Sequence, residues 1–300
     1  MMQALSTWHR TLFRRGFLIL FVLVTLNAAA GQDARFLWKH TSDQPELILG
    51  LRTVCLQMLP RGSVQLFTGF EFVDGWEAPL SRFRGPLYLA GMLRFDFYVS
   101  SYVSIKITGV LQEFQRIQGD PDLSGYDVKS DVANDIGDFS VATVVTLLSQ
   151  KRHRPAVGMR IETKLPNTNQ EHGLGPNTTD VTLSLLASHR AGSLIAFGDM
   201  GVGILTAPRL LNEQNDVFVY GFGFIWKLSE EWRIAGEVNG FVSTRLTTPV
   251  GTESRGYVRL GCVWSLPRLA VEVYPGYGLT GREGAFRLMV GLSWKAIHKT

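Results

Sequence analysis

Cysteine and charge are both scarce in this 300-residue sequence. Its two cysteines, Cys55 and Cys262, are too few for a fold built on disulfides, and we interpret them as small apolar residues. Charged residues make up 19% of the chain and hydrophobic ones 45%, which excludes a disordered chain. Lys and Arg number 30 against 26 Asp and Glu, but Arg10, Arg14 and Arg15 belong to the amino terminus. The remaining chain is close to neutral, so no nucleic-acid partner is expected.

Long apolar runs are also missing, because no segment beyond the amino terminus reaches the roughly 18 residues of a transmembrane helix. The first residues combine His9 and the three arginines with an apolar run at 17–26 and the tripeptide Ala28-Ala29-Ala30. A positive region, about ten apolar residues and an A-x-A exit are the three parts of a secretory signal peptide. A membrane-anchoring helix would need about twenty apolar residues. The sequence therefore predicts a signal peptide over residues 1–30 and an exported mature chain.

From residue 62 onward, apolar and polar residues alternate with a period of two, which is typical of strands with one apolar and one polar face. In residues 87–99, Leu87 and Leu89 belong to the predicted apolar face and Tyr88 to the polar one. The segments have about ten to thirteen residues, whereas ordinary strands have five or six and membrane-crossing strands nine to eleven. Twelve such segments occur, at 62–73, 87–98, 101–113, 137–149, 154–165, 178–190, 193–205, 215–227, 231–243, 254–265, 268–279 and 284–294.

The connections between these segments alternate between short and long. This is the pattern of outer-membrane barrels, which have tight periplasmic turns and longer external loops. An even number of strands leaves both chain ends in the periplasm. We therefore predict an all-β fold, a transmembrane antiparallel β-barrel of about 12 strands over residues 62–294, in the bacterial outer membrane. A tail at 295–300 follows the barrel.

The two faces of the strands carry different residues. Four tryptophans lie at the predicted periplasmic strand ends on the apolar face, where an interface belt is expected: Trp226, Trp232, Trp264 and Trp294. Charged side chains facing mid-bilayer lipid would cost about 2–4 kcal/mol each, so the polar face must line the lumen. The predicted lumen or pore-lining residues are Glu71, Tyr88, Arg94, Asp96, Tyr98, Lys106, Asp138, Arg160, Glu162, Lys164, Asp180, Asp199, Arg233, Glu237, Arg255, Arg259, Glu272 and Arg287. Charges of both signs are balanced there, which predicts a network of ion pairs.

Several short motifs resemble an outer-membrane barrel family labelled for meta-pathway phenol degradation. Residues 134–139 (NDIGDF) resemble its GxGDL strand opening, and 154–158 with 162–167 resemble its P-x-L-x-x-G and LPTG segments. Further similar pieces lie at 173–177, 180–183, 279–281 and 286–292, so the resemblance spans from Leu59 to Trp294. Asn167 stands where the family has Gly, and residues follow Trp294, although many barrels end on the aromatic residue that barrel-assembly machinery recognises. The resemblance implies an outer-membrane protein that transports aromatic compounds.

Three functions fit these observations. The barrel could be a narrow channel or transporter for small, hydrophobic or aromatic solutes, surrounded by outer-membrane lipids. It could instead be a closed structural or surface-interaction barrel. The third function, an outer-membrane hydrolase, is disfavoured because Ser188 and His189 are neighbours on one strand and point to opposite faces.

Two segments remain open at the level of sequence. Residues 31–61 precede the first strand and contain the apolar stretch 47–51, so they could plug the barrel, pair at its seam or stay in the periplasm. The acidic loop near 113–135 has the spacing of a calcium loop through Asp120, Asp122, Ser124 and Asp131. It lacks flanking helices, and a solvated external loop is the preferred interpretation. No metal and no cofactor are predicted.

Overall fold

The structure, a computed structural model, describes residues 46–128, 130–207 and 213–297. The predicted signal peptide and the last three residues lie outside this range. The described chain contains one short 3-10 helix, η1 (Gln170–His172), and no helix in it is long and apolar enough to cross a membrane. Its strands are β1 (Val64–Glu77), β2 (Arg84–Ser100), β3 (Val103–Arg116), β4 (Val132–Asp135), β5 (Phe139–Leu148), β6 (Ala156–Leu165), β7 (Asp180–Ala191), β8 (Leu194–Thr206), β9 (Gln214–Lys227), β10 (Trp232–Ser243), β11 (Arg255–Ser265), β12 (Leu269–Gly278) and β13 (Glu283–Ala296).

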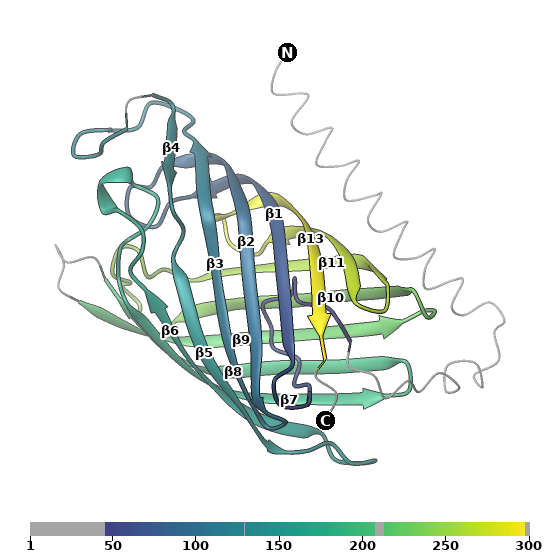
Figure 1. Ribbon diagram of the computed structural model, residues 1–300. Helices are drawn as coiled ribbons and strands as arrows, with labels where there is room; N and C mark the ends of the chain where they lie inside the picture. Colours follow the sequence, from purple (N-terminus) through teal and green to yellow (C-terminus); the bar gives the residue numbers. More distant parts are fainter. Residues whose placement is uncertain (1–45, 129, 208–212, 298–300) are drawn as a thin grey trace. The chain divides into compact units, whose positions relative to one another are not determined.

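These strands pair antiparallel in chain order and close into a barrel, with β1 between β2 and β13 (Figure 1). β4 and β5 both pair with β3 and keep one register, since Glu113 lies opposite Asp135 and Thr108 opposite Ser140. They are two pieces of one wall strand that is interrupted at residues 136–138. The wall therefore has twelve strands, and the predicted antiparallel barrel of about 12 strands is confirmed.

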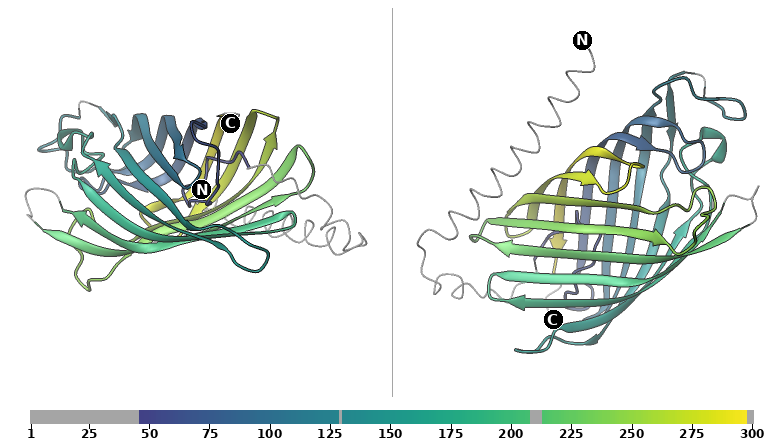
Figure 2. Two further views of the ribbon diagram at one scale, coloured as in Figure 1. Left: turned by 60° about the horizontal axis from the view of Figure 1, so that its bottom comes forward. Right: turned by 180° about the vertical axis from the view of Figure 1, so that it is seen from behind.

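The connections divide the barrel into a short-turn end and a long-loop end (Figure 2). Residues 101–102, 192–193, 228–231 and 266–268 make the tight turns of the short-turn end. The long-loop end carries residues 117–131, 166–179 and 244–254, but 279–282 is short there. The loop expected at 74–86 is reduced to 78–83, because β1 and β2 both extend further than the alternation predicts.

Side chains alternate between a lumenal and an outer face. On β7, Val181, Leu183 and Leu185 are exposed, whereas Ser184 and Ser188 are buried. Exposed apolar side chains recur on the outer face around the wall, at Leu66, Ile161, Val202, Phe222 and Val290 among others. An apolar exterior around a polar interior is the arrangement of a barrel whose outer face contacts lipid.

One predicted lumen residue, Tyr88, lies on the outer face instead. It is 38% exposed, and its ring centroid lies 5.2 Å from that of Phe72. Gly91 is the cause: it adopts a φ of 66° and adds one residue to β2 relative to β1, so the alternation shifts there. Leu87 and Leu89, before this bulge, are consequently buried inside the barrel. The assignment of Tyr88 to the lumen is therefore wrong.

Candidate functional site

The lumen holds a stretch of chain that precedes the first strand, residues 46–57, which we call the lumenal segment. Its apolar residues 47–49 and 51 are buried in one cluster with inward-facing side chains from across the barrel. Those wall residues include Phe67 of β1, Ile225 of β9 and Met289 of β13. Apolar burial thus draws this stretch into the barrel interior, where it contacts several strands at once.

Two glutamates of the wall bind the main chain of this segment. The Glu272 carboxylate on β12 accepts hydrogen bonds from the backbone N–H groups of Leu49 (2.9 Å) and Gly50 (3.0 Å). The Glu237 carboxylate on β10 accepts from those of Arg52 (3.0 Å) and Thr53 (2.7 Å). Each carboxylate therefore satisfies two consecutive N–H donors that have no strand partner. Hydrogen bonds to a charged group contribute roughly 1.5–3 kcal/mol each, so the two carboxylates are strong attachment points.

One arginine binds the carbonyl groups of the same stretch. A terminal nitrogen of Arg94 on β2 donates to the backbone oxygens of Leu49 (3.1 Å) and Leu51 (2.9 Å). The other two guanidinium nitrogens donate to Asp96, each over 3.0 Å, which fixes the plane of the group. Lys106 on β3 contacts the same Asp96 carboxylate, and both residues are buried. N–H and C=O groups of the segment are thus bound by opposite charges.

The ends of the lumenal segment lie toward the short-turn end. Glu46 pairs with Arg233 (2.6 Å) at the start of β10 and with Arg190 (3.4 Å) at the end of β7. The Leu56 N–H donates to the hydroxyl of Ser188 over 2.8 Å. The chain then joins β1, which begins at this same end of the barrel. The segment is therefore a loop that enters and leaves through one mouth.

The remaining predicted lumen residues form ion pairs along the wall. Arg287 contacts Glu71 (2.8 Å), and Lys164 contacts Asp138 (3.2 Å) and Asp180 (2.7 Å). Arg160 lies 3.4 Å from both Asp199 and Glu162, Arg259 lies 2.6 Å from Glu237, and Tyr98 donates to Gln65 over 3.3 Å. Charged side chains of the wall are thus paired, as expected. Glu237, Glu272 and Arg94 in addition bind the lumenal segment, which the sequence did not indicate.

Tyr257 and Tyr274 are lumenal residues that the sequence reading missed. The guanidinium of Arg287 lies 4.2 Å from the Tyr257 ring centroid and that of Arg259 lies 5.1 Å from it. Arg259 also lies 5.7 Å from the Tyr274 ring. Tyr257 stands between Arg255 and Arg259 on β11, so the same alternation that selects the two arginines would have selected it.

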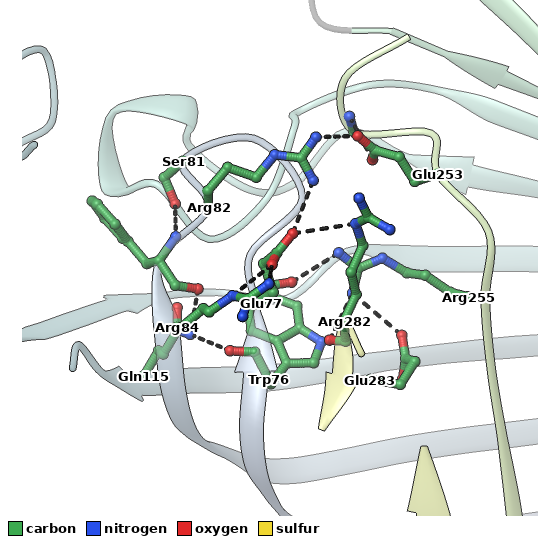
Figure 3. A network of polar contacts seen from close by, with 12 residues as sticks. Trp76, Glu77, Ser81, Arg82, Arg84, Gln115, Glu253, Arg255, Arg282 and Glu283 are labelled. Carbon is green, nitrogen blue, oxygen red and sulfur yellow. Dashed lines mark hydrogen bonds and ion pairs between the residues drawn. The ribbon is translucent and has the colours of Figure 1, made fainter. Parts of the chain in front are cut away.

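A second polar cluster lies at the long-loop end (Figure 3). The carboxylate of Glu77, the last residue of β1, contacts Arg82 (3.0 Å), Arg84 (2.7 Å) and Arg282 (3.2 Å). Arg82 also contacts Glu253 in the loop before β11. The cluster therefore ties the β1–β2 loop to loops from the other side of the seam. Predicted lumen residue Arg255 joins it, donating to the backbone oxygen of Glu77 (2.8 Å) and pairing with Glu283 (3.3 Å).

Apolar packing supports this end of the barrel. Phe83 and Leu174, from two different loops, are buried in one cluster with Ala78, Ile117 and Ala133. The hydroxyl of Ser81 donates to the backbone oxygen of Gly173 over 2.6 Å. The loops at the long-loop end are thus folded against each other.

The predicted tryptophan belt lies at the short-turn end. Trp226 is near the end of β9, Trp232 begins β10, and the two others are near the ends of β11 and β13. Trp232 and Trp264 are directly opposite each other and are 49% and 39% exposed. Their placement matches the level at which tryptophans contact a membrane interface.

The residues considered for a metal site and for a hydrolase have other partners in the structure. Asp122 accepts from the backbone N–H of Ser124 (2.9 Å), and Asp131 pairs with Arg116 (3.3 Å). Within the described ranges, no three His, Cys, Asp or Glu side chains are grouped as metal ligands. Ser188 is buried and bound to the lumenal segment, while its neighbour His189 belongs to the opposite face of β7.

Comparison with known proteins identifies a shared fold. No family model matches the sequence, and no curated protein matches it significantly. An outer membrane channel from Pseudomonas putida F1 is similar in structure, with a TM-score of 0.55 and 12% identity over 84% of this chain and 100% of that one. The CymD monoaromatic hydrocarbon channel has a TM-score of 0.43 and 9% identity, covering 81% of this chain and 90% of that one. The toluene transporter TbuX from Ralstonia pickettii has 0.41 and 10%, covering 80% and 90%. The first similarity shows the fold of an outer-membrane barrel.

Proposed function

We propose that this protein is a narrow channel or transporter for small solutes in the bacterial outer membrane, closed at rest by the lumenal segment. The observation that carries the proposal is the relation between this segment and the wall. The barrel closes on itself through β1 and β13, so the wall is complete without the segment. What holds the segment is hydrogen bonding and apolar packing, both of which are reversible.

The geometry also gives the segment a way out. Because it enters and leaves through the short-turn end, it can withdraw without threading past the wall. Withdrawal would expose Arg94, Glu237, Glu272 and the tyrosines of β11 and β12, together with the apolar wall residues that now pack against the segment. Such a path has both polar and apolar walls, and the fold shared with an outer membrane channel supports passage as the role. The family resemblance extends the proposal to aromatic solutes and to transport rather than catalysis.

Single-channel recording in planar bilayers tests the proposal. We expect the wild-type protein to be mostly closed and the double variant Glu237→Gln, Glu272→Gln to show frequent conducting steps. A neutral amide offers one acceptor oxygen and turns an NH2 group toward backbone donors, so the segment is held less tightly. Glu162→Gln is the matched control, because Glu162 lies on the lumenal face and pairs with Arg160 (3.4 Å) instead of the segment.

Two results would contradict the proposal, one its channel and the other its closure by the lumenal segment. A folded double variant without conducting steps would favour the closed structural barrel. Equal conductance in the wild type, the double variant and the control would mean that the lumenal segment does not close the passage.

A further inference from the structure

The lumen recognises the lumenal segment mainly through its main chain. Glu272 and Glu237 each bind two consecutive N–H groups of the segment, and Arg94 binds two of its carbonyl groups. Contacts of this kind do not depend on the side chains of the bound segment. The backbone bends at Gly50, Arg52 and Thr53, so that consecutive N–H groups point toward one carboxylate, and side-chain pockets can add specificity.

The wall holds these binding groups in place by itself. The Glu237 carboxylate accepts from Arg259 (2.7 Å) and Tyr257 (3.2 Å), both on β11. Glu272 accepts from the hydroxyl groups of Tyr274 (3.1 Å) and Ser293. Because wall residues orient both carboxylates, the site persists when its occupant leaves. A site that is ordered before binding loses less entropy on binding.

The site also has side-chain requirements. Leucine and isoleucine side chains of residues 47–49 and 51 fill the apolar cluster of the lumen. At position 50 the wall approaches so closely that a Cβ atom would lie 2.3 Å from Cε of Met289 and 2.8 Å from a carboxylate oxygen of Glu272. A larger residue at this position would have to displace the side-chain ends of Met289 and Glu272, so the site favours glycine there and apolar residues around it.

We propose that the lumen is a binding site for a bent, apolar peptide with a central glycine, and that residues 46–57 occupy it as a tethered ligand. The inference rests on the proposed function in one respect, that the lumen is the passage, and it deepens that function by naming a class of molecule that enters. A peptide supplied from outside the chain competes with the tethered segment for Glu237, Glu272 and Arg94.

The experiment uses the full chain with Gly50→Val, which displaces the tethered segment by steric conflict and leaves every wall residue intact. A fluorescent synthetic peptide with the sequence of residues 46–56, carrying Ser in place of Cys55, is titrated against this variant in detergent, and its anisotropy is measured. We expect saturable binding at least about tenfold tighter than to the wild-type protein, whose site is already filled. The same peptide with N-methyl groups at positions 50 and 53 loses one hydrogen bond to each carboxylate and should bind at least about tenfold more weakly.

Two further substitutions test whether the binding site is intact in the Gly50→Val protein. Adding Glu272→Gln to the Gly50→Val chain should weaken the binding of the unmodified peptide, while adding Glu162→Gln should leave it unchanged. Equal binding to wild type and Gly50→Val, or equal binding of the N-methylated peptide, overturns the proposal. Binding in detergent needs no ion flow, so its failure is distinguishable from failure of the channel, which is read from current alone.

Discussion

The reactivity of a thiol depends on how deeply it is buried, so the thiol of Cys55 can report whether the lumenal segment stays in the barrel. It lies on the lumenal segment and packs against the apolar cluster, and burial raises its pKa to about 11. The other cysteine, Cys262, is exposed on β11 and can be replaced by serine. In a Cys262→Ser chain we expect iodoacetamide at pH 8 to alkylate Cys55 slowly. Glu272→Gln should raise that rate at least about tenfold, because a released thiol has its ordinary pKa near 8.5. An unchanged rate, with the Glu162→Gln chain as control, would contradict release of the segment.

The pH dependence of this reaction gives a second residue-level prediction. The thiolate is the reactive form, so below a pKa of about 11 the rate of the covered Cys55 should rise about tenfold per pH unit from pH 7 to about pH 10. After release, the rate should level off above about pH 9, since the thiol is then mostly ionised. Initial alkylation rates, measured by mass spectrometry across this range, distinguish the two profiles. If the alkylation rate already levels off near pH 9 in the chain that keeps Glu272, Cys55 is not covered.

Within strand β2, Gly91 determines which side chains face the lumen and which face outward. Its φ of 66° favours glycine, and a Cβ there would lie 2.9 Å from Cδ1 of Leu111. We expect Gly91→Ala to destabilise the barrel by about 1–3 kcal/mol, seen as a lower temperature of unfolding in detergent. Gly119 is the matched control, because it also has a positive φ of 89° but open space around it. An equal effect of the alanine substitution at both glycines would assign the loss to backbone strain alone.

The same bulge explains how far sequence reasoning reaches. A period of two locates the strands and assigns Arg94 and Asp96 to the lumen, because charged residues strongly prefer the polar face. It misplaces Tyr88, since the alternation is counted through Gly91 and one extra residue reverses every face before it. Sequence reasoning also misses β4, because it assigns residues 132–135 to the acidic loop that precedes the segment at 137–149. Glu237, Glu272 and Arg94 bind the main chain of the lumenal segment, so these bonds leave no side-chain pattern in the sequence.

For the whole molecule, the seam between β1 and β13 decides whether the barrel closes. Gly69 and Gly291 are opposite each other there, and the ring of Phe67 fills the space beside them. A Cβ on Gly291 would lie 2.1 Å from Cε2 of that ring. Closure leaves no strand edge in the membrane, so a closed barrel resists detergent and runs faster on a gel before boiling than after it. We expect this mobility shift in outer-membrane fractions of cells that express the wild-type chain.

Gly291→Val should then lower the temperature at which the fast form converts to the slow one, because the valine and Phe67 cannot both occupy the seam. Phe67→Ala removes the ring, so the double variant should regain part of the lost stability despite the cavity that alanine leaves. Conversion temperatures of the four proteins form a double-mutant cycle. If the two substitutions are additive, the ring does not limit the approach of the strands. If Gly291→Val converts at the wild-type temperature, β1 and β13 do not pair in this register, and closure must be achieved differently.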